Sequence, residues 1–263
     1  MARRTAQRRA AVLTSAIAVG AMLVAALAPA AGAAVQPACR VKNPTQDTWF
    51  ATQDGRALTT AIAAANPGDR LNVFGTCRGN FVIDKNLRIF GNTQASAPTV
   101  LDGRGSGRVL TVLPRLVGTV TVTLARLVVT GGGEGGIEVG EGTVVALNNS
   151  TVRGNSSATS HVGGGIANGG DLTLNNTTVT GNRAVLDGGG IFNFGDLTLN
   201  RSRLTRNTAG GGGGGLFSEG VAVLNFSRVT GNTAAFGGGI LSVNTLTLNS
   251  TVVSGNVPDD CAC

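Results

Sequence analysis

The stretch from Asp171 to Gly220 decides the fold, because it contains one pattern twice. Residues 171–195 are DLTLNNTTVTGNRAVLDGGGIFNFG, and residues 196–220 are DLTLNRSRLTRNTAGGGGGGLFSEG. The two halves are equal in length, begin with DLTLN, and place three glycines before an aliphatic residue. A fixed period of about 25 residues predicts a repeat architecture in which neighbouring repeats bury a common core.

Three columns of residues keep the same period on both sides of this stretch. One column contains the asparagines Asn155, Asn182, Asn207, Asn232 and Asn256. A second contains the aliphatic residues that follow the glycines, Ile166, Ile191, Leu216 and Ile240. A third contains leucines that directly precede an asparagine, Leu147, Leu174, Leu199, Leu224 and Leu248. The columns and the apolar–polar alternation between them predict an all-β, right-handed parallel β-helix over residues 71–256, with three short strands per coil.

The asparagine column is expected to be structural. Parallel coils stack at about 4.8 Å, so each asparagine lies against its copy and their amides can bond in a ladder. Asparagine also tolerates the left-handed backbone that a turn between strands requires. Five residues earlier, a hydroxyl column predicts inward-facing or turn hydrogen bonds; it comprises Ser150, Thr177, Ser202, Ser227 and Thr251.

The segment 1–33 has the pattern of a secretory signal peptide. Four arginines precede an apolar run from Ala10 to Leu27, and small residues follow around Ala31–Ala33. Its removal lowers the formal charge from +7 to +3, so nucleic-acid binding is not implied. Because no second apolar run follows, we expect a secreted, extracellular or cell-surface protein without a membrane span after cleavage.

Residues 34–70 are expected to form an amino-terminal cap. Leu58, Ala61, Ile62 and Ala65 have helical spacing, and Asn66-Pro67-Gly68 ends the segment. This short helix would cover the first coil, whose open edge would otherwise invite aggregation. Residues 257–263 are expected to be a carboxy-terminal tail.

The four cysteines lie near the two ends of the mature chain. If the domain is a rod, its ends are too far apart for cross-linking, which leaves Cys39 and Cys77 as the expected disulfide. Cys261 and Cys263 are separated by one residue. They are expected to be free thiols, an intermolecular link or a labile pair.

The run ALTTAIAAANPGD at residues 57–69 resembles the amino-terminal segment of secreted bacterial proteins in the pectin-lyase-like, right-handed β-helix group. The later coils resemble this group too. Their Gly-Gly-Gly-Ile repeats are similar to half of the repeat in chlamydial polymorphic outer-membrane proteins, whose Phe-x-x-Asn half is missing here. The resemblance implies the fold but no single activity, since the group includes pectate lyases, polygalacturonases and adhesins.

Two clusters are candidates for chemistry. Asp171 and Asp196 occupy one column in adjacent coils, so their carboxylates are expected about 5 Å apart. Such a pair could bind calcium or act as an acid and a nucleophile; the structural alternative is that each aspartate caps a turn. No other metal or cofactor is expected. Arginines crowd two neighbouring coils and suit the carboxylates of acidic sugars, with a solvated basic face as the alternative; they are Arg201, Arg203, Arg206 and Arg228.

Three functions remain open. The first hypothesis is a non-catalytic secreted or surface protein that presents a polar, arginine-bearing face to polysaccharide, cell-surface glycan or another surface component. The second is a polysaccharide lyase or glycoside hydrolase that acts on an acidic polysaccharide along one groove, with Asp171, Asp196 and the arginines taking part. A third is an assembly module that pairs through its terminal cysteines. His161, the only histidine, is expected to be an ordinary loop residue.

Overall fold

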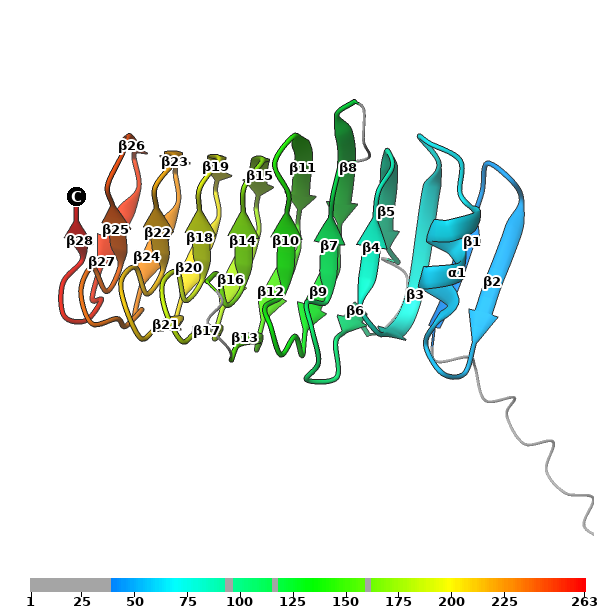
Figure 1. Ribbon diagram of the computed structural model, residues 1–263, viewed down its shortest axis with the longest axis horizontal. Coiled ribbons are helices and arrows are strands. Elements are labelled where there is room, and N and C mark those ends of the chain that lie inside the picture. The colour runs from blue at the N-terminus through cyan, green and yellow to red at the C-terminus, as the bar shows by residue number, and fades with distance from the viewer. Residues whose placement is uncertain (1–38, 93–96, 115–117, 159–161) are drawn as a thin grey trace, which may run out of the picture. The chain divides into compact units, whose positions relative to one another are not determined.

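Three parallel sheets wind into a β-solenoid of about seven turns in the computed structural model (Figure 1). The structure describes residues 39–92, 97–114, 118–158 and 162–263, all within one unit, Pro37–Cys263. The proposed signal peptide at residues 1–33 and the histidine at position 161 lie outside the described residues.

Each coil contributes one strand to each of the three sheets, which we name A, B and C. Sheet A consists of the first half of β3 (Arg70–Arg78), β5 (Leu87–Gly91), β8 (Val120–Ala125), β11 (Thr143–Asn148), β15 (Asp171–Asn175), β19 (Asp196–Asn200), β23 (Val221–Asn225) and β26 (Leu246–Asn249). Sheet B consists of the second half of β3, β6 (Thr99–Asp102), β9 (Leu127–Thr130), β12 (Thr151–Arg153), β16 (Thr178–Thr180), β20 (Arg203–Thr205), β24 (Arg228–Thr230) and β27 (Val252–Ser254).

Sheet C completes each coil, and a small additional sheet runs through three of the coils. Sheet C consists of β4 (Phe81–Ile83), β7 (Leu110–Val112), β10 (Ile137–Val139), β14 (Ile166–Asn168), β18 (Ile191–Asn193), β22 (Leu216–Ser218), β25 (Ile240–Ser242) and β28 (Cys261–Ala262). The small sheet consists of β13 (Ser156–Ser157), β17 (Arg183–Ala184) and β21 (Thr208–Ala209).

The predicted register of the coils is confirmed. Leu174 pairs with Leu199 and Leu199 with Leu224, while Ile191 pairs with Leu216 in sheet C. These side chains are fully buried, so the period of the sequence is the period of the core. The alternating residues, such as Thr173 and Thr198, point outward and are half-buried.

The asparagine ladder is also confirmed. Asn182 donates from Nδ2 to Asn207 Oδ1 at 3.1 Å, and Asn207 donates to Asn232 Oδ1 at 3.0 Å. The expected reason for asparagine was partly wrong, because no ladder asparagine has a left-handed backbone. The residue before each one does instead, with φ of 62° at Gly181 and 55° at Arg206. Asparagine is therefore present for its buried amide, which bonds both to its copy and to the backbone of the neighbouring coil.

The hydroxyl and glycine columns serve the same close stacking. Ser202 Oγ accepts the backbone N–H of Thr177 at 3.1 Å and donates to Leu174 O at 3.1 Å. A Cβ placed on Gly190 would lie 2.5 Å from Gly215 O in the next coil. Only glycine fits there, because the two backbones approach too closely for a side chain.

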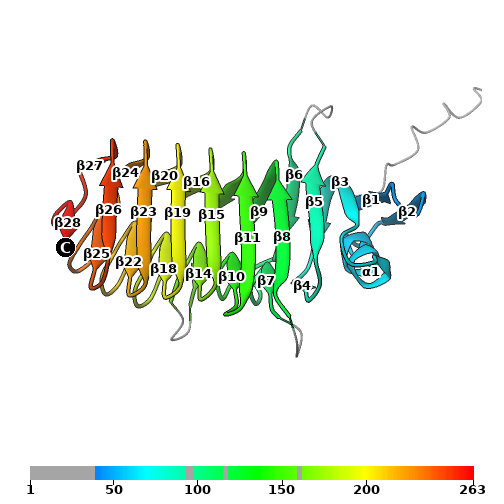
Figure 2. The same cartoon turned by 90° about the horizontal axis from the view of Figure 1, so that it is seen from above.

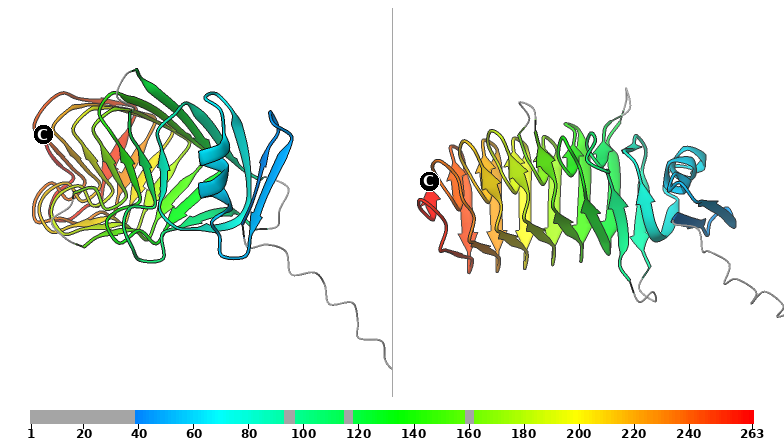
Figure 3. Two further views of the ribbon diagram at one scale, coloured as in Figure 1. Left: turned by 45° about the vertical axis from the view of Figure 1, so that its right-hand side comes forward. Right: turned by 90° about the horizontal axis from the view of Figure 1, so that it is seen from below.

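The amino-terminal cap contains two strands in addition to the expected helix. Helix α1 (Ala57–Ala64) buries Leu58, Ala61 and Ile62 as predicted, and it lies beside the first coil (Figure 3). An antiparallel pair that was not predicted extends sheet A, namely β1 (Cys39–Asn43) and β2 (Thr48–Thr52). The predicted disulfide between Cys39 and Cys77 is present and joins β1 to β3.

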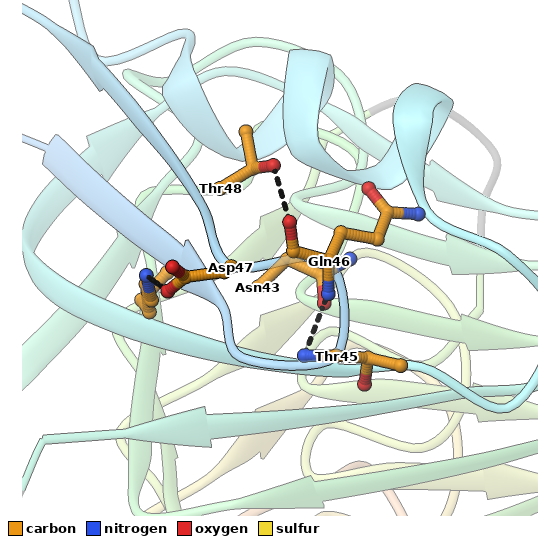
Figure 4. A network of polar contacts seen from close by, with 6 residues as sticks. Asn43, Thr45, Gln46, Asp47 and Thr48 are labelled. Atoms are coloured by element: carbon orange, nitrogen blue, oxygen red, sulfur yellow. Dashed lines mark hydrogen bonds and ion pairs between the residues drawn. The ribbon is translucent and has the colours of Figure 1, made fainter.

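Polar side chains, with Asn43 buried among them, fix the β1–β2 turn. Asn43 Oδ1 accepts the backbone N–H groups of Thr45 and Gln46 at 3.0 and 3.2 Å, and Thr48 Oγ1 donates to Gln46 O at 3.0 Å (Figure 4). The Nδ2 of Asn43 donates to Asp69 Oδ2 at 2.8 Å, which ties the turn to the chain entering the first coil.

The carboxy-terminal segment differs from the expected tail. Cys261 pairs with Ile240, so residues after Asn256 complete the last coil as β28. Cys261 and Cys263 form a disulfide, which decides among the three predicted states. Asp260 Oδ1 accepts Asn256 Nδ2 at 2.9 Å and thus ends the asparagine ladder. No coil of the described chain covers this end, and Leu248 is 40% exposed where its partner Leu224 is fully buried.

Candidate binding surface

Three of the four predicted arginines line one hollow, where sheet A turns into sheet B. Arg203 and Arg228 are paired in register on β20 and β24. Arg201 occupies the preceding turn, and its guanidinium carbon lies 5.7 Å from the ring centroid of Phe226. The hollow has a volume of about 310 Å³, and we call Arg201, Arg203 and Arg228 around it the Arg201 surface.

Arg206 does not belong to this surface. It follows Thr205 at the far end of β20, in the next turn, and does not line the hollow. The hollow therefore brings together three of the four predicted arginines. Strand β20 of sheet B separates Arg206 from Arg201, although the two residues are close in the sequence.

The electrostatics of the Arg201 surface favour anions. Its three arginines are exposed, and among the described residues none of them is within ion-pair distance of an acidic side chain. A planar guanidinium presents N–H pairs that match carboxylate or sulfate oxygens. The surface can therefore hold an anionic group without first breaking an internal ion pair.

Phe226 and Asn176 also line this hollow, and the sequence analysis missed both. The repeat offered the signal, because Asn176, Arg201 and Phe226 follow one another at the same period as the leucine and asparagine columns. All three have positive φ, of 50°, 49° and 51° respectively, so this column is a tight outward turn whose side chains project from the solenoid.

The two aspartates lie together on a different edge. Asp171 and Asp196 begin β15 and β19 and are paired in register, so their Cα atoms are about 4.8 Å apart. With Glu141, Glu219 and the exposed Phe194 they line a hollow of about 350 Å³, which we call the acidic hollow. In the described ranges, no lysine or arginine forms an ion pair with these carboxylates.

The arginines and the aspartates do not share one groove. Asp196 is the first residue of β19, and Arg201 directly follows its last residue, Asn200. Five residues of extended chain span about 16 Å. The expected single groove is therefore not formed, because the aspartates lie where the strands of sheet A begin and the arginines lie beyond where they end.

Glu138, near the acidic hollow, has a structural partner. Its carboxylate lies 3.2 Å from Arg108 Nε. Burial lowers the pKa of the Arg108 guanidinium, and the nearby Glu138 carboxylate opposes that shift. Among the described residues, no group of three or more histidine, cysteine, aspartate or glutamate side chains is arranged to hold a metal ion.

The geometry defines the class of protein as a parallel β-solenoid with asparagine ladders and surface clusters of unpaired charge. The chain matches no family model, no curated protein and no solved structure. No helix in the part of the chain that the structure describes is long and apolar enough to cross a membrane.

Proposed function

We propose that this chain is a secreted or cell-surface β-solenoid that binds an anionic carbohydrate, without converting it, through the Arg201 surface. One observation carries the proposal: three exposed guanidinium groups converge on one hollow, and no acidic side chain among the described residues neutralises them. Acidic sugars supply the carboxylate or sulfate groups that such donors bind. Export of the chain rests on the signal-like pattern of residues 1–33.

Loss of the guanidinium groups tests this proposal. We expect Arg201→Gln/Arg203→Gln/Arg228→Gln to weaken binding of a uronate or sulfated polysaccharide at least about tenfold in calorimetry, because every charge-assisted contact is lost. Arg153→Gln is the matched control, since Arg153 is exposed on β12 but does not line the hollow. Affinity of the unaltered protein should fall as salt is raised. Undiminished binding by the triple variant would contradict the proposal.

A lyase or hydrolase is the second candidate, and the paired carboxylates of Asp171 and Asp196 favour it. Their Cα atoms are paired in register, which allows a carboxyl separation of about 5 Å, as in retaining glycosidases. Purified protein would be incubated with polygalacturonate and alginate, with and without calcium. The binding proposal expects no new unsaturated or reducing ends. Product formation that is lost in Asp171→Asn or Asp196→Asn would instead assign catalysis to the acidic hollow.

A further inference from the structure

A second concentration of positive charge lies at the amino-terminal end of sheet A. The strands β1, β2, β3 and β5 lie side by side at this end of the sheet (Figure 2). Because strand residues alternate between faces, one set of their side chains projects from the outer face. We call this set, with the arginine that follows β8, the cap face. It consists of the cations Arg40, Lys42, Arg70, Arg88 and Arg126 and the rings of Trp49, Phe74 and Phe90.

Arginines and rings of the cap face are stacked on one another. Arg70 Cζ lies 4.3 Å from the ring centroid of Phe90, and Arg126 Cζ lies 5.4 Å from the same centroid. Arg40 Cζ lies 5.6 Å from the centroids of both Trp49 and Phe74. Cation–π contacts hold these guanidinium groups in place before any ligand arrives, so less side-chain entropy is lost on binding.

The cap face contains its own hollow. Arg70, Arg126 and Phe90 line a volume of about 220 Å³ together with polar Asn72. Arg70 donates from Nε to Asn72 Oδ1 at 2.8 Å, which orients its fork. Within the described ranges, neither Arg70 nor Arg126 forms an ion pair. The hollow therefore combines two oriented, unneutralised guanidinium groups.

The stacking also indicates which kind of chemical group the cap face can bind. Guanidinium groups already lie over the ring of Phe90 and beside the rings of Trp49 and Phe74, which contact each other. Nucleic-acid bases that need an open ring face for stacking would have to displace them. Carboxylate or sulfate groups need only the N–H donors, so the arrangement favours oxyanions over bases.

The cap face reaches, at Arg126, the edge of the solenoid that carries the Arg201 surface. In the turns between sheets A and B, Arg126, Asn149, Asn176 and Arg201 occupy equivalent positions in successive coils, each directly after a strand paired in register. Three coil spacings separate Arg126 from Arg201, or about 14 Å. Between them, Asn176 donates from Nδ2 to Asn149 Oδ1 at 2.8 Å, and both amides are exposed.

We propose that the hollow between Arg70 and Arg126 is a second oxyanion site, and that one strand of an anionic polysaccharide occupies it and the Arg201 surface together. The inference rests on the proposed function. It adds that the ligand runs across successive coils and that it must have a minimum length. Binding at the second hollow becomes intramolecular once the first is filled, which raises the affinity only for chains long enough to span both.

A size series of uronate and of sulfated oligosaccharides, titrated by calorimetry, tests the proposal and distinguishes the two sources of oxyanion. We expect affinity to rise by about tenfold or more once a chain exceeds the span of about 14 Å. Arg70→Gln/Arg126→Gln should abolish that rise and leave the affinity of short chains for the Arg201 surface unchanged. Arg104→Gln is the matched control, because Arg104 is exposed and shares the left-handed backbone of Arg126, with φ of 57° at both.

Each outcome bears on one claim. Short-chain binding that needs the Arg201 surface, with no effect of Arg70→Gln/Arg126→Gln on long chains, would overturn the second site and leave the proposed function standing. Long-chain binding that survives loss of the Arg201 surface would overturn the proposed function and the shared strand. Tighter binding of single-stranded DNA of equal length would overturn the assignment to polysaccharide. Thermal melting of each variant shows that the fold is retained.

Discussion

At the scale of single residues, buried amides hold neighbouring coils together. Asn207 is fully buried, and both halves of its amide are used twice. Its Nδ2 donates to Asn232 Oδ1 and to Val179 O, each at 3.0 Å, while its Oδ1 accepts the backbone N–H and the Nδ2 of Asn182 at 3.0 and 3.1 Å. Every hydrogen-bonding position of the amide is satisfied by a neighbouring coil, so its loss leaves several buried groups unpaired.

We therefore expect Asn207→Ala to lower the free energy of unfolding by about 2–3 kcal/mol. Asn249→Ala is the control, because Asn249 is exposed and its side chain makes one ladder bond, to Asn225 at 2.8 Å. That substitution should change stability by less than about 0.5 kcal/mol. Denaturant titration measures both; equal losses would show that the inner ladder does not carry the stability assigned to it.

The turn before the ladder contains one strained residue. The positions equivalent to Arg206 in neighbouring coils are Gly181 and Gly231, and all three have positive φ. An arginine with this backbone conformation is strained by about 1–2 kcal/mol. Glycine would relieve the strain, but its greater freedom in the unfolded chain would cancel part of the gain in stability.

Arg206→Gly should accordingly raise the free energy of unfolding by about 0.5–1 kcal/mol. Because Arg206 does not line the hollow of the Arg201 surface, polysaccharide affinity should stay unchanged. Arg203→Gly, within β20, should lower stability instead. Weaker ligand binding by Arg206→Gly would return this residue to the binding group.

At the scale of elements, the cap helix depends on the coil beneath it. Helix α1 has no side-chain cap at its N-cap residue, Arg56, and no basic residue in its last turn. Lys85, from the turn before β5, supplies the missing cation: its Nζ donates to the carbonyls of Ile62, Ala63 and Ala65 at 3.1, 3.3 and 3.2 Å. A cation at the carboxyl end of a helix satisfies free carbonyls and complements the helix dipole.

Lys85→Met should therefore destabilise the cap by about 1 kcal/mol, since the apolar stem remains but the three donors are lost. Hydrogen exchange of the amides in α1 is the appropriate measurement, because it reports local opening. Arg56→Met, at the exposed start of the same helix, should have little effect. Unchanged protection of α1 in Lys85→Met would contradict the role given to Lys85.

At the scale of the whole molecule, the solenoid has two unlike ends. Helix α1, β1, β2 and the Cys39–Cys77 disulfide cover the first coil, whereas the last coil leaves Leu248 partly exposed. Coils contact only their neighbours, so stability accumulates coil by coil. The cap face also depends on this arrangement, because β1 contributes Arg40 to it.

The disulfide bridges residues 38 apart in the sequence. In the chain-entropy model, closing a loop of that length contributes about 3–4 kcal/mol, so Cys39→Ala/Cys77→Ala should lower stability by this amount. The Cys261–Cys263 disulfide closes almost no loop, so Cys261→Ala/Cys263→Ala should lower stability far less. Comparable thermal melting of the two double variants would show that the cap is held by packing alone.

The periodic part of this protein could be predicted in detail, and the irregular part could not. From Leu147 onward the spacing is nearly constant, so columns of equal residues predicted register, core and ladder. In the first coils, Arg70 pairs with Arg88 and Arg88 pairs with Thr123, and the second interval along the chain is far longer than the first. Unequal turn lengths conceal these neighbours in the sequence, which is why the cap face was missed.

The sequence by itself determined that the chain winds into stacked coils, because a residue that must lie on its own copy repeats at a fixed interval. Only the tertiary structure decided which charges act together. Arg201 and Arg206 are near in the chain but lie at opposite ends of β20, while Arg70 and Arg126 lie far apart in the chain yet contact one ring. The extended strand between two turns separates the first pair, and the stacking of coils brings the second pair together.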